Sequence, residues 1–173
     1  MIPLSSANSR GLTWSKIQCG RGYELTLDGN VVGTLRRPGF WSQTFLAETQ
    51  QGQWKFCRSG FLCNGAEIVD AVSGQPVANF KSSWSGNGNL IFADGQSFRF
   101  ECKGWWHPVC SVLTDSGQPV LRLHVREKTV ELPEAVTMAD GRLYLLALFA
   151  RYRMLQTEED AASATTVAVI VAS

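Results

Sequence analysis

The sequence predicts a mainly β protein, a closed antiparallel barrel of about twelve strands that encloses a hydrophobic C-terminal α-helix. Three observations predict it. Glycine-bearing turns punctuate the first 130 residues, apolar and polar residues alternate between these turns, and an uncharged helix-forming run follows at 143–150. At 173 residues the chain has the length of one domain that can bury its own core.

The turns are regularly spaced, which predicts a series of hairpins. Five glycines in them lie 23, 22, 21 and 22 residues apart: Gly29, Gly52, Gly74, Gly95 and Gly117. One hairpin per step accounts for this period. The segment SGQPV at 73–77 recurs at 116–120, which indicates one structural unit used more than once.

Between the turns, alternation with a period of two predicts strands that have one buried face. Phe98, Phe100 and Cys102, for example, alternate with charged residues. A shift of one residue would turn such an apolar set into water, so the register is well specified. Strands are expected near residues 12–19, 22–28, 30–36, 41–49, 53–59, 64–71, 75–82, 88–93, 96–103, 107–114, 119–126 and 129–132.

The run 143–150 (LYLLALFA) is expected to fill this barrel. It is rich in strong helix formers, and a helix that is apolar on every side must be enclosed or lie in lipid. It is too short to span a bilayer, which takes about 20 apolar residues. A barrel of twelve strands is wider than side chains alone can fill, and a helix is about 10–12 Å across.

We therefore expect a single domain, 1–173, with barrel strands in 12–138, a central helix at 140–156 and a tail at 157–173. Asp140 is the expected N-cap. Arg151 and Arg153 suggest that the helix emerges from the barrel near residue 151. The β-branched segment 165–171 is compatible with a further strand, at the barrel surface or in a partner.

Composition narrows the setting and the partners. Sixteen Lys and Arg against 15 Asp and Glu give a net charge of +1, so no nucleic-acid partner is expected and any anion binding needs a local patch. The first ten residues lack the pattern of a secretory signal. Five cysteines without a C-x-x-C pair argue against a disulfide framework. A cytoplasmic protein, peripheral at the membrane if it binds lipid, is the expectation.

The layout resembles the tubby C-terminal-like superfamily, which includes tubby proteins, LURP-one-related proteins and phospholipid scramblases. The resemblance covers roughly residues 12–156, and its marks are the D-G and S-G-Q-P-V turns, the segments 39–41 (GFW) and 104–106 (GWW), and the closing run 143–155. The chain looks like a small bacterial relative of the LURP-one-related type. The resemblance implies a barrel that encloses a C-terminal helix. Tubby proteins are known for binding phosphoinositides through basic surface residues. No D-x-[DN]-x-[DN]-G loop supports calcium control.

A basic ladder is the candidate binding site. Its members are Arg99, Lys103, Arg122, Arg126 and Lys128. If neighbouring strands align them, several cations can hold one phosphate group; the alternative is that the outer face of a barrel simply needs charges. We therefore expect a non-enzymatic binding or scaffold protein, with anionic phospholipid headgroups as one candidate ligand and a protein partner as another. No cofactor and no transmembrane segment are expected.

Aromatic residues are numerous and can take two places in such a barrel. They include Trp41, Trp54, Trp84, Trp105 and Trp106, with Phe40 and Phe45. On strands they are expected to fill the space between sheet and helix. Those beside Gly39 and Gly104 can instead lie at the barrel rim and contact a membrane interface or a partner.

The competing hypothesis is a hydrolase-type enzyme with a surface site near His107 and Cys110, since Cys–His pairs supply activated nucleophiles. With Cys102 these residues also offer soft metal ligands, but the spacing C-x4-H-x2-C matches no structural zinc pattern. The alternation along its strand places His124 on the outer face, so its side chain is expected to be solvated. We expect no metal site.

The cysteine pattern makes a testable prediction about the protein isolated under reducing conditions. Titration with a thiol reagent in denaturant should count five free thiols and release no metal, because free cysteine is usually a small buried hydrophobe. Fewer than five thiols in such a preparation would contradict the reduced state.

Overall fold

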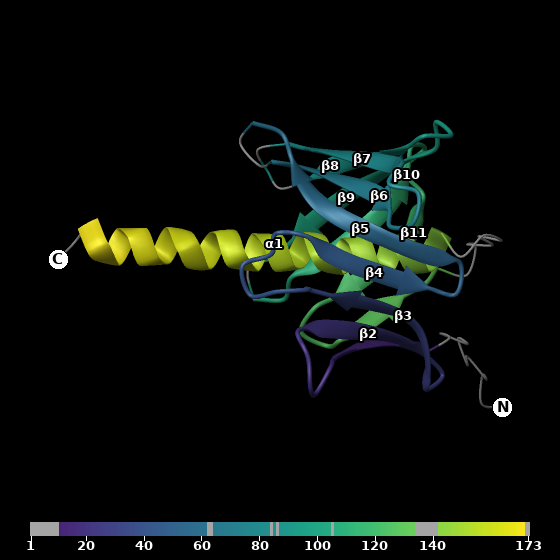
Figure 1. Ribbon diagram of the computed structural model, residues 1–173, viewed down its shortest axis with the longest axis horizontal. Coiled ribbons are helices and arrows are strands. Elements are labelled where there is room, and N and C mark those ends of the chain that lie inside the picture. Colours follow the sequence, from purple (N-terminus) through teal and green to yellow (C-terminus); the bar gives the residue numbers. More distant parts are fainter. Residues whose placement is uncertain are drawn as a thin grey trace, which may run out of the picture.

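The computed structural model describes residues 11–61, 64–83, 85, 87–104, 106–133 and 142–171, with side chains up to residue 164. Within these residues the chain forms twelve strands followed by one helix (Figure 1). The elements are β1 (Leu12–Lys16), β2 (Gly22–Leu27), β3 (Asn30–Arg36), β4 (Phe45–Thr49), β5 (Gly52–Ser59), β6 (Gly65–Asp70), β7 (Pro76–Ser82), β8 (Gly88–Phe92), β9 (Ser97–Lys103), β10 (Val109–Thr114), β11 (Pro119–His124), β12 (Thr129–Glu131) and α1 (Arg142–Val171).

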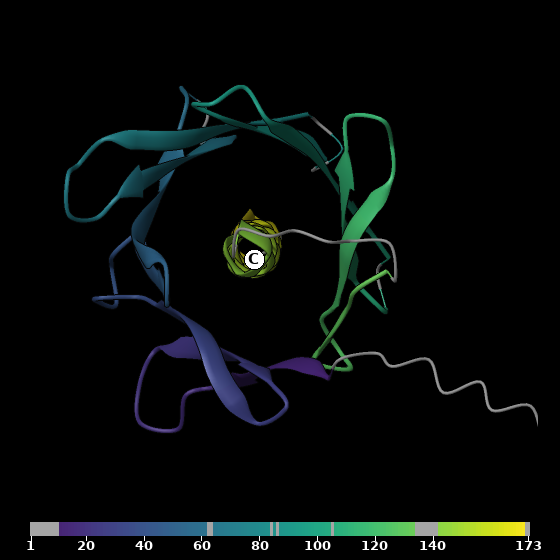
Figure 2. The ribbon, with the colours of Figure 1, turned by 90° about the vertical axis from the view of Figure 1, so that its right-hand side faces the viewer.

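The strands form one closed sheet. Each strand runs antiparallel to the one before it, and β1 pairs with β12 through Leu12 and Val130, so the ring has no free edge. Seen end-on, α1 stands in the middle of this ring (Figure 2). The predicted fold class, a closed antiparallel barrel around a C-terminal helix, is confirmed.

Alternation along the strands sets which side chains face the helix. On β9, Phe98 and Phe100 are fully buried while Arg99 between them is exposed. The two SGQPV segments form equivalent turns, β6–β7 and β10–β11, and Pro76 and Pro119 are the first residues of their strands. Proline has no N–H to donate to the hydrogen-bond ladder, and the first position of a strand is one of the few that tolerate this loss.

Helix α1 is longer and more deeply buried than its sequence suggests. Every side chain from Leu145 to Gln156 is buried, including Arg151 and Arg153, so the inference that the helix emerges near residue 151 is wrong. The helix also continues to Val171 instead of ending near residue 156, and the segment 165–171 is helical instead of a strand. The proposed N-cap, Asp140, lies outside the described residues.

Phe149 is the centre of the interior packing. Its ring lies 5.3–5.6 Å from the rings of Phe56, Phe80, Phe100 and Tyr152, mostly in edge-to-face arrangements. Such aromatic pairs contribute about 0.5–1.5 kcal/mol each beyond the area they bury. Aromatic rings from several walls of the barrel therefore meet on one helical residue.

On the β3 side the helix approaches the wall closely. A Cβ at Gly33 would lie 3.1 Å from the Cδ1 atom of Leu148, so a larger residue there would push the helix away. Glycine at this position lets the backbone of β3 and the side chain of Leu148 pack directly.

The two ends of the barrel differ. At the start end, Arg142 at the beginning of α1 is paired with Asp94 in the β8–β9 turn, at 2.8 Å. At the exit end, α1 leaves the ring and continues beyond the strands (Figure 1). Because the strands alternate in direction, the connections β1–β2, β3–β4, β5–β6, β7–β8, β9–β10 and β11–β12 all lie at the exit end. Across the described residues, no helix combines the length and the apolarity needed to cross a membrane.

Replacing a helix residue inside the barrel should be costly. Leu146 is 0% exposed, and Leu146→Ala is expected to lower the free energy of unfolding by about 2–5 kcal/mol. Leu46→Ala is the matched control, because Leu46 lies on the outer face of β4; it should cost less than about 1 kcal/mol. Denaturant unfolding measures both. A soluble, cooperatively unfolding protein that lacks residues 143–173 would contradict the filling role of the helix.

Candidate functional site

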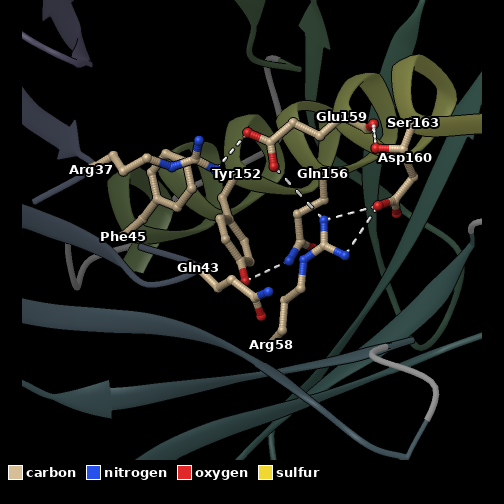
Figure 3. A pocket seen from close by; sticks show the side chains of 9 residues that line it. All are labelled: Arg37, Gln43, Phe45, Arg58, Tyr152, Gln156, Glu159, Asp160 and Ser163. Carbon is tan, nitrogen blue, oxygen red and sulfur yellow. Dashed lines mark hydrogen bonds and ion pairs between the residues drawn. The ribbon is translucent and has the colours of Figure 1, made fainter. Parts of the chain in front are cut away.

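Where α1 leaves the barrel, two arginines of the wall hold it by ion pairs. Arg37, just after β3, contacts Glu159 at 2.5 Å, and Arg58 on β5 contacts Asp160 at 3.0 Å (Figure 3). Both arginine side chains are largely buried. These pairs join elements far apart in the sequence, so they fix where the helix crosses the exit end.

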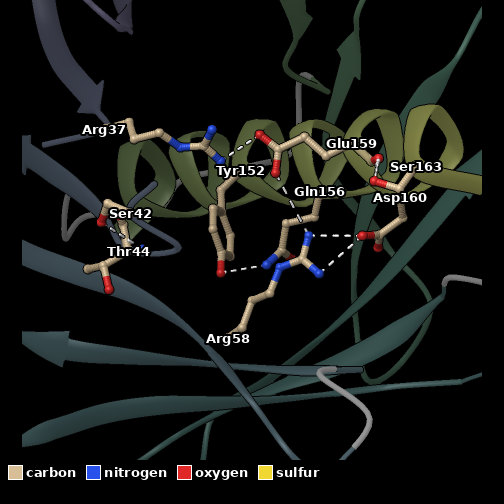
Figure 4. A network of polar contacts seen from close by, with 9 residues as sticks. All are labelled: Arg37, Ser42, Thr44, Arg58, Tyr152, Gln156, Glu159, Asp160 and Ser163. Carbon is tan, nitrogen blue, oxygen red and sulfur yellow. Dashed lines mark hydrogen bonds and ion pairs between the residues drawn. The ribbon is translucent and has the colours of Figure 1, made fainter. Parts of the chain in front are cut away.

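A cleft of about 230 Å³ lies between these groups. It is lined by Arg37, Gln43, Phe45, Arg58, Tyr152, Gln156, Glu159, Asp160 and Ser163. Beneath it, the Gln156 amide donates a hydrogen bond of 2.6 Å to the Tyr152 hydroxyl (Figure 4). Carboxylates of the helix already neutralise both arginines. The ion pairs that line the cleft therefore hold the helix to the barrel wall.

The two arginines inside the barrel have very different partners. Arg151 lies over the rings of Trp14 and Tyr23, at 4.3 and 4.5 Å, and its guanidinium donates to Glu158 at 3.0 Å. Arg153 lies over Phe80 at 4.5 Å and donates to the amide oxygen of Gln156. Among the described residues Arg153 has no carboxylate partner, and burial lowers its pKa.

The predicted basic ladder does not form one cationic face. Strand β10 lies between β9 and β11, so Arg99 and Lys103 do not lie on a strand next to that of Arg122, and the alignment that the ladder requires is not met there. Glu101 contacts both Arg99, at 3.1 Å, and Lys103, at 3.5 Å. Arg122 is 3.8 Å from Glu131. On the wall of the barrel these cations are therefore matched by carboxylates.

The other two members of the ladder lie elsewhere. Arg126 and Lys128 are in the β11–β12 turn at the exit end, where both are exposed. Lys128 has a φ of +58°, a conformation that belongs to the tight turn. The ladder is thus divided between the wall and the exit end.

His107 and Cys110 do not form the predicted pair. His107 is exposed and contacts Glu127 at 3.4 Å, whereas Cys110 is fully buried and faces Cys102. In the part of the chain that the structure describes, no three or more His, Cys, Asp or Glu residues gather as metal ligands.

The exit end carries a second feature, a set of exposed aromatic residues. Phe40 and Trp41 in the β3–β4 connection are 63% and 90% exposed, Phe61 after β5 is 101% exposed and Trp106 after β9 is 77% exposed. Among the described residues, every exposed aromatic side chain lies at this end. Of the other tryptophans, Trp54 is half-buried against the core, and Trp84 and Trp105 lie outside the described residues.

Unpaired cations share the exit end with these aromatics. Within the described residues, six exposed basic side chains at the exit end have no ion pair: Lys16, Arg21, Arg36, Lys81, Arg126 and Lys128. Arg21 lies over the ring of Phe40, at 4.7 Å. We call these six cations and the four exposed aromatics the exit rim.

The start end has the opposite charge. Its turns and strand ends carry Asp28, Asp70, Asp94 and Asp115. Hydrogen bonds from the backbone of Ser73 and Gln96 lower the pKa of Asp70 and Asp94, so these carboxyls stay ionised. The net charge of +1 therefore conceals a separation of charge along the barrel axis.

The aromatics beside Gly39 and Gly104 take the rim position that the sequence offered as the alternative, since Phe40, Trp41 and Trp106 are exposed at one end of the barrel. The sequence analysis missed that Phe61 and the six cations share this end. The signal was available, because alternate connections of an up-and-down barrel lie at the same end.

Comparison with known proteins adds little to this geometry. No protein-family model matches the chain, and no curated protein matches it. Among solved structures, the X-ray structure of a protein from Arabidopsis thaliana is similar over 86% of this chain and 93% of its own, at 14% identity and a TM-score of 0.36. A likeness of that degree carries no functional argument.

The contrast between the two buried arginines can be tested. Arg151→Met should lower the free energy of unfolding by about 1–3 kcal/mol, because it removes two ring contacts and an ion pair. Arg153→Met should lower the free energy of unfolding by distinctly less. The charge that it removes is desolvated and has no carboxylate partner, so its removal offsets part of the lost contacts. Urea unfolding of both variants measures the difference. A larger loss for Arg153→Met would contradict the assignment.

Proposed function

We propose that this protein is a non-enzymatic binding protein that docks its exit rim onto an anionic phospholipid membrane surface. The observation that carries the proposal is the shared location of four exposed aromatics, six unpaired cations and the projecting end of α1. Each of these features taken alone is compatible with an ordinary protein surface. Together, at one end of the molecule, they match the requirements of a membrane interface.

The aromatic residues supply the apolar part of the interaction. Large exposed aromatics are uncommon on a surface unless they contact something, and tryptophan is enriched at the level of lipid headgroups. Trp41 and Trp106 lie on different connections, so they can enter the interface at separate points.

The cations supply the electrostatic part. A Lys or Arg near an anionic leaflet contributes about 1 kcal/mol, and the effect falls off within a Debye length of about 8 Å. The aspartates of the start end are repelled by the same surface. The separation of charge therefore orients the barrel with its exit end toward the membrane.

The end of α1 fits the same orientation. Residues 161–171 contain no charged residue, and at 1.5 Å per residue they extend about 16 Å. That length enters one leaflet without crossing a hydrocarbon core of about 30 Å.

Membership of the tubby C-terminal-like superfamily, as a LURP-one-related type, is part of this proposal, and the twelve strands around one enclosed helix support it. We place the protein in the cytoplasm, peripheral to the membrane. No observation favours the hydrolase hypothesis, because the Cys110 thiol faces the interior while His107 contacts Glu127 outside.

Sedimentation with vesicles tests the docking surface. The protein should bind phosphatidylcholine vesicles that contain phosphatidylserine, and binding should weaken with salt and in vesicles of phosphatidylcholine alone. Trp41→Ser/Trp106→Ser and Lys16→Glu/Lys81→Glu should each weaken it by roughly tenfold or more.

Matched controls separate the exit rim from the wall. Lys55→Glu/Arg122→Glu makes the same charge change on the barrel wall, and Val72→Ser removes an apolar side chain that is 87% exposed at the start end. Both should bind like the unaltered protein. Equal weakening by the wall variants, or no binding to either type of vesicle, would contradict the proposal and leave a protein partner as the ligand to seek.

A further inference from the structure

Two cysteines meet inside the barrel near the exit end. Cys102 on β9 lies directly opposite Cys110 on β10, and their sulfur atoms are 3.0 Å apart. Cys110 is fully buried, while Cys102 is partly exposed. Both are free thiols, as are the other described cysteines, Cys19 and Cys57; Cys63 lies outside the described residues.

The backbone suits a bond between these sulfurs. The N–H of Cys102 donates to the side chain of Asn87 on the β8 side, so its peptide groups point away from β10. Cys102 and Cys110 are therefore a non-hydrogen-bonded pair, in which the Cα atoms are about 4.5 Å apart and the side chains are close. Disulfides occur at Cα separations of about 4.4–6.8 Å.

Arg153 supplies a positive charge beside the pair. Its side chain is 8% exposed, its Nε atom has no hydrogen-bond partner, and no carboxylate among the described residues neutralises it. The hydrogen bond with Cys110 and the charge of Arg153 both lower the pKa of Cys102. The hydrogen bond with Cys102 and burial raise the pKa of Cys110.

We propose that Cys102 and Cys110 are a redox-active dithiol that low-molecular-weight disulfides such as glutathione disulfide oxidise to an intramolecular disulfide, with Arg153 stabilising the Cys102 thiolate. This is independent of membrane docking. A metal site is a poorer fit, because two thiolates beside a buried guanidinium offer few ligands and repel a cation.

The reaction balances in two exchange steps. The Cys102 thiolate attacks one sulfur of glutathione disulfide, which forms a mixed disulfide and releases one glutathione thiolate. Cys110 then loses its proton to solvent or to the released thiolate, and its sulfur attacks the Cys102 sulfur, which releases the second glutathione. The protein loses two electrons and two protons, and glutathione disulfide is reduced to two glutathione molecules.

The roles are assigned by exposure and charge. Cys102 is the attacking group because it is partly exposed and closer to ionisation, and the thiolate is the nucleophile in such exchange. Cys110 is the resolving group because it is enclosed and its sulfur lies 3.0 Å from the Cys102 sulfur. The expected product is therefore a disulfide, without stable glutathione on the protein.

The experiment uses the full chain with Cys19, Cys57 and Cys63 replaced by serine, so that two thiols remain. After incubation with glutathione disulfide, mass spectrometry should show loss of two hydrogen atoms, no glutathione adduct and a linked peptide pair that contains Cys102 and Cys110. Dithiothreitol should restore both thiols. Retention of both thiols, or a lasting glutathione adduct, would overturn the proposal.

Single replacements in that background test each role. Cys110→Ser should trap glutathione on Cys102, whereas Cys102→Ser should leave Cys110 unmodified. Arg153→Met should slow oxidation at pH 7 by roughly threefold or more, and Arg153→Lys should largely retain the rate, because the charge persists. Equal rates in these two variants, both shown by thermal melts to be folded, would overturn the role of Arg153.

Discussion

The structure depends on one constraint, which is that the helix 142–171 has an apolar section without any face for water. A ring of twelve strands has the converse problem, since its wall side chains alone do not fill it. Each solves the problem of the other. Phe149 meets rings from three strands, and Gly33 gives room for Leu148, so helix and wall are fitted to each other residue by residue.

Enclosure extends to polar groups, and this determines how the helix leaves the barrel. Arg151 is held between two rings and by Glu158, while Arg37 and Arg58 on the wall reach the carboxylates that follow on the helix. Unpaired charges would end the buried part of a helix. Here the charges are paired, so the helix stays buried up to the point where it leaves the barrel. Arg153 is the exception among them, because it is buried beside two thiols without a carboxylate.

Much of the fold could be predicted from residue patterns because they are local. The twelve strands, the turns at Gly74 and Gly117 and the enclosed run 143–150 follow from alternation, turn residues and apolarity. The burial of Arg151 could not be predicted, since its ring partners Trp14 and Tyr23 are distant in sequence. Neither could the separation of β9 from β11, or the cross-strand pairing of Cys102 with Cys110, without the strand register.

The closed ring with one helix through it gives the molecule two unlike ends, and the function proposed here belongs to the exit end. Hydrogen exchange with and without anionic vesicles tests this most directly, because it reports on every connection of the barrel at once. Anionic vesicles are expected to slow exchange in the connections 37–44 and 125–128 and to leave exchange in the turns 71–75 and 115–118 unchanged. Slower exchange at the start end, or no change at either end, would contradict the proposed function.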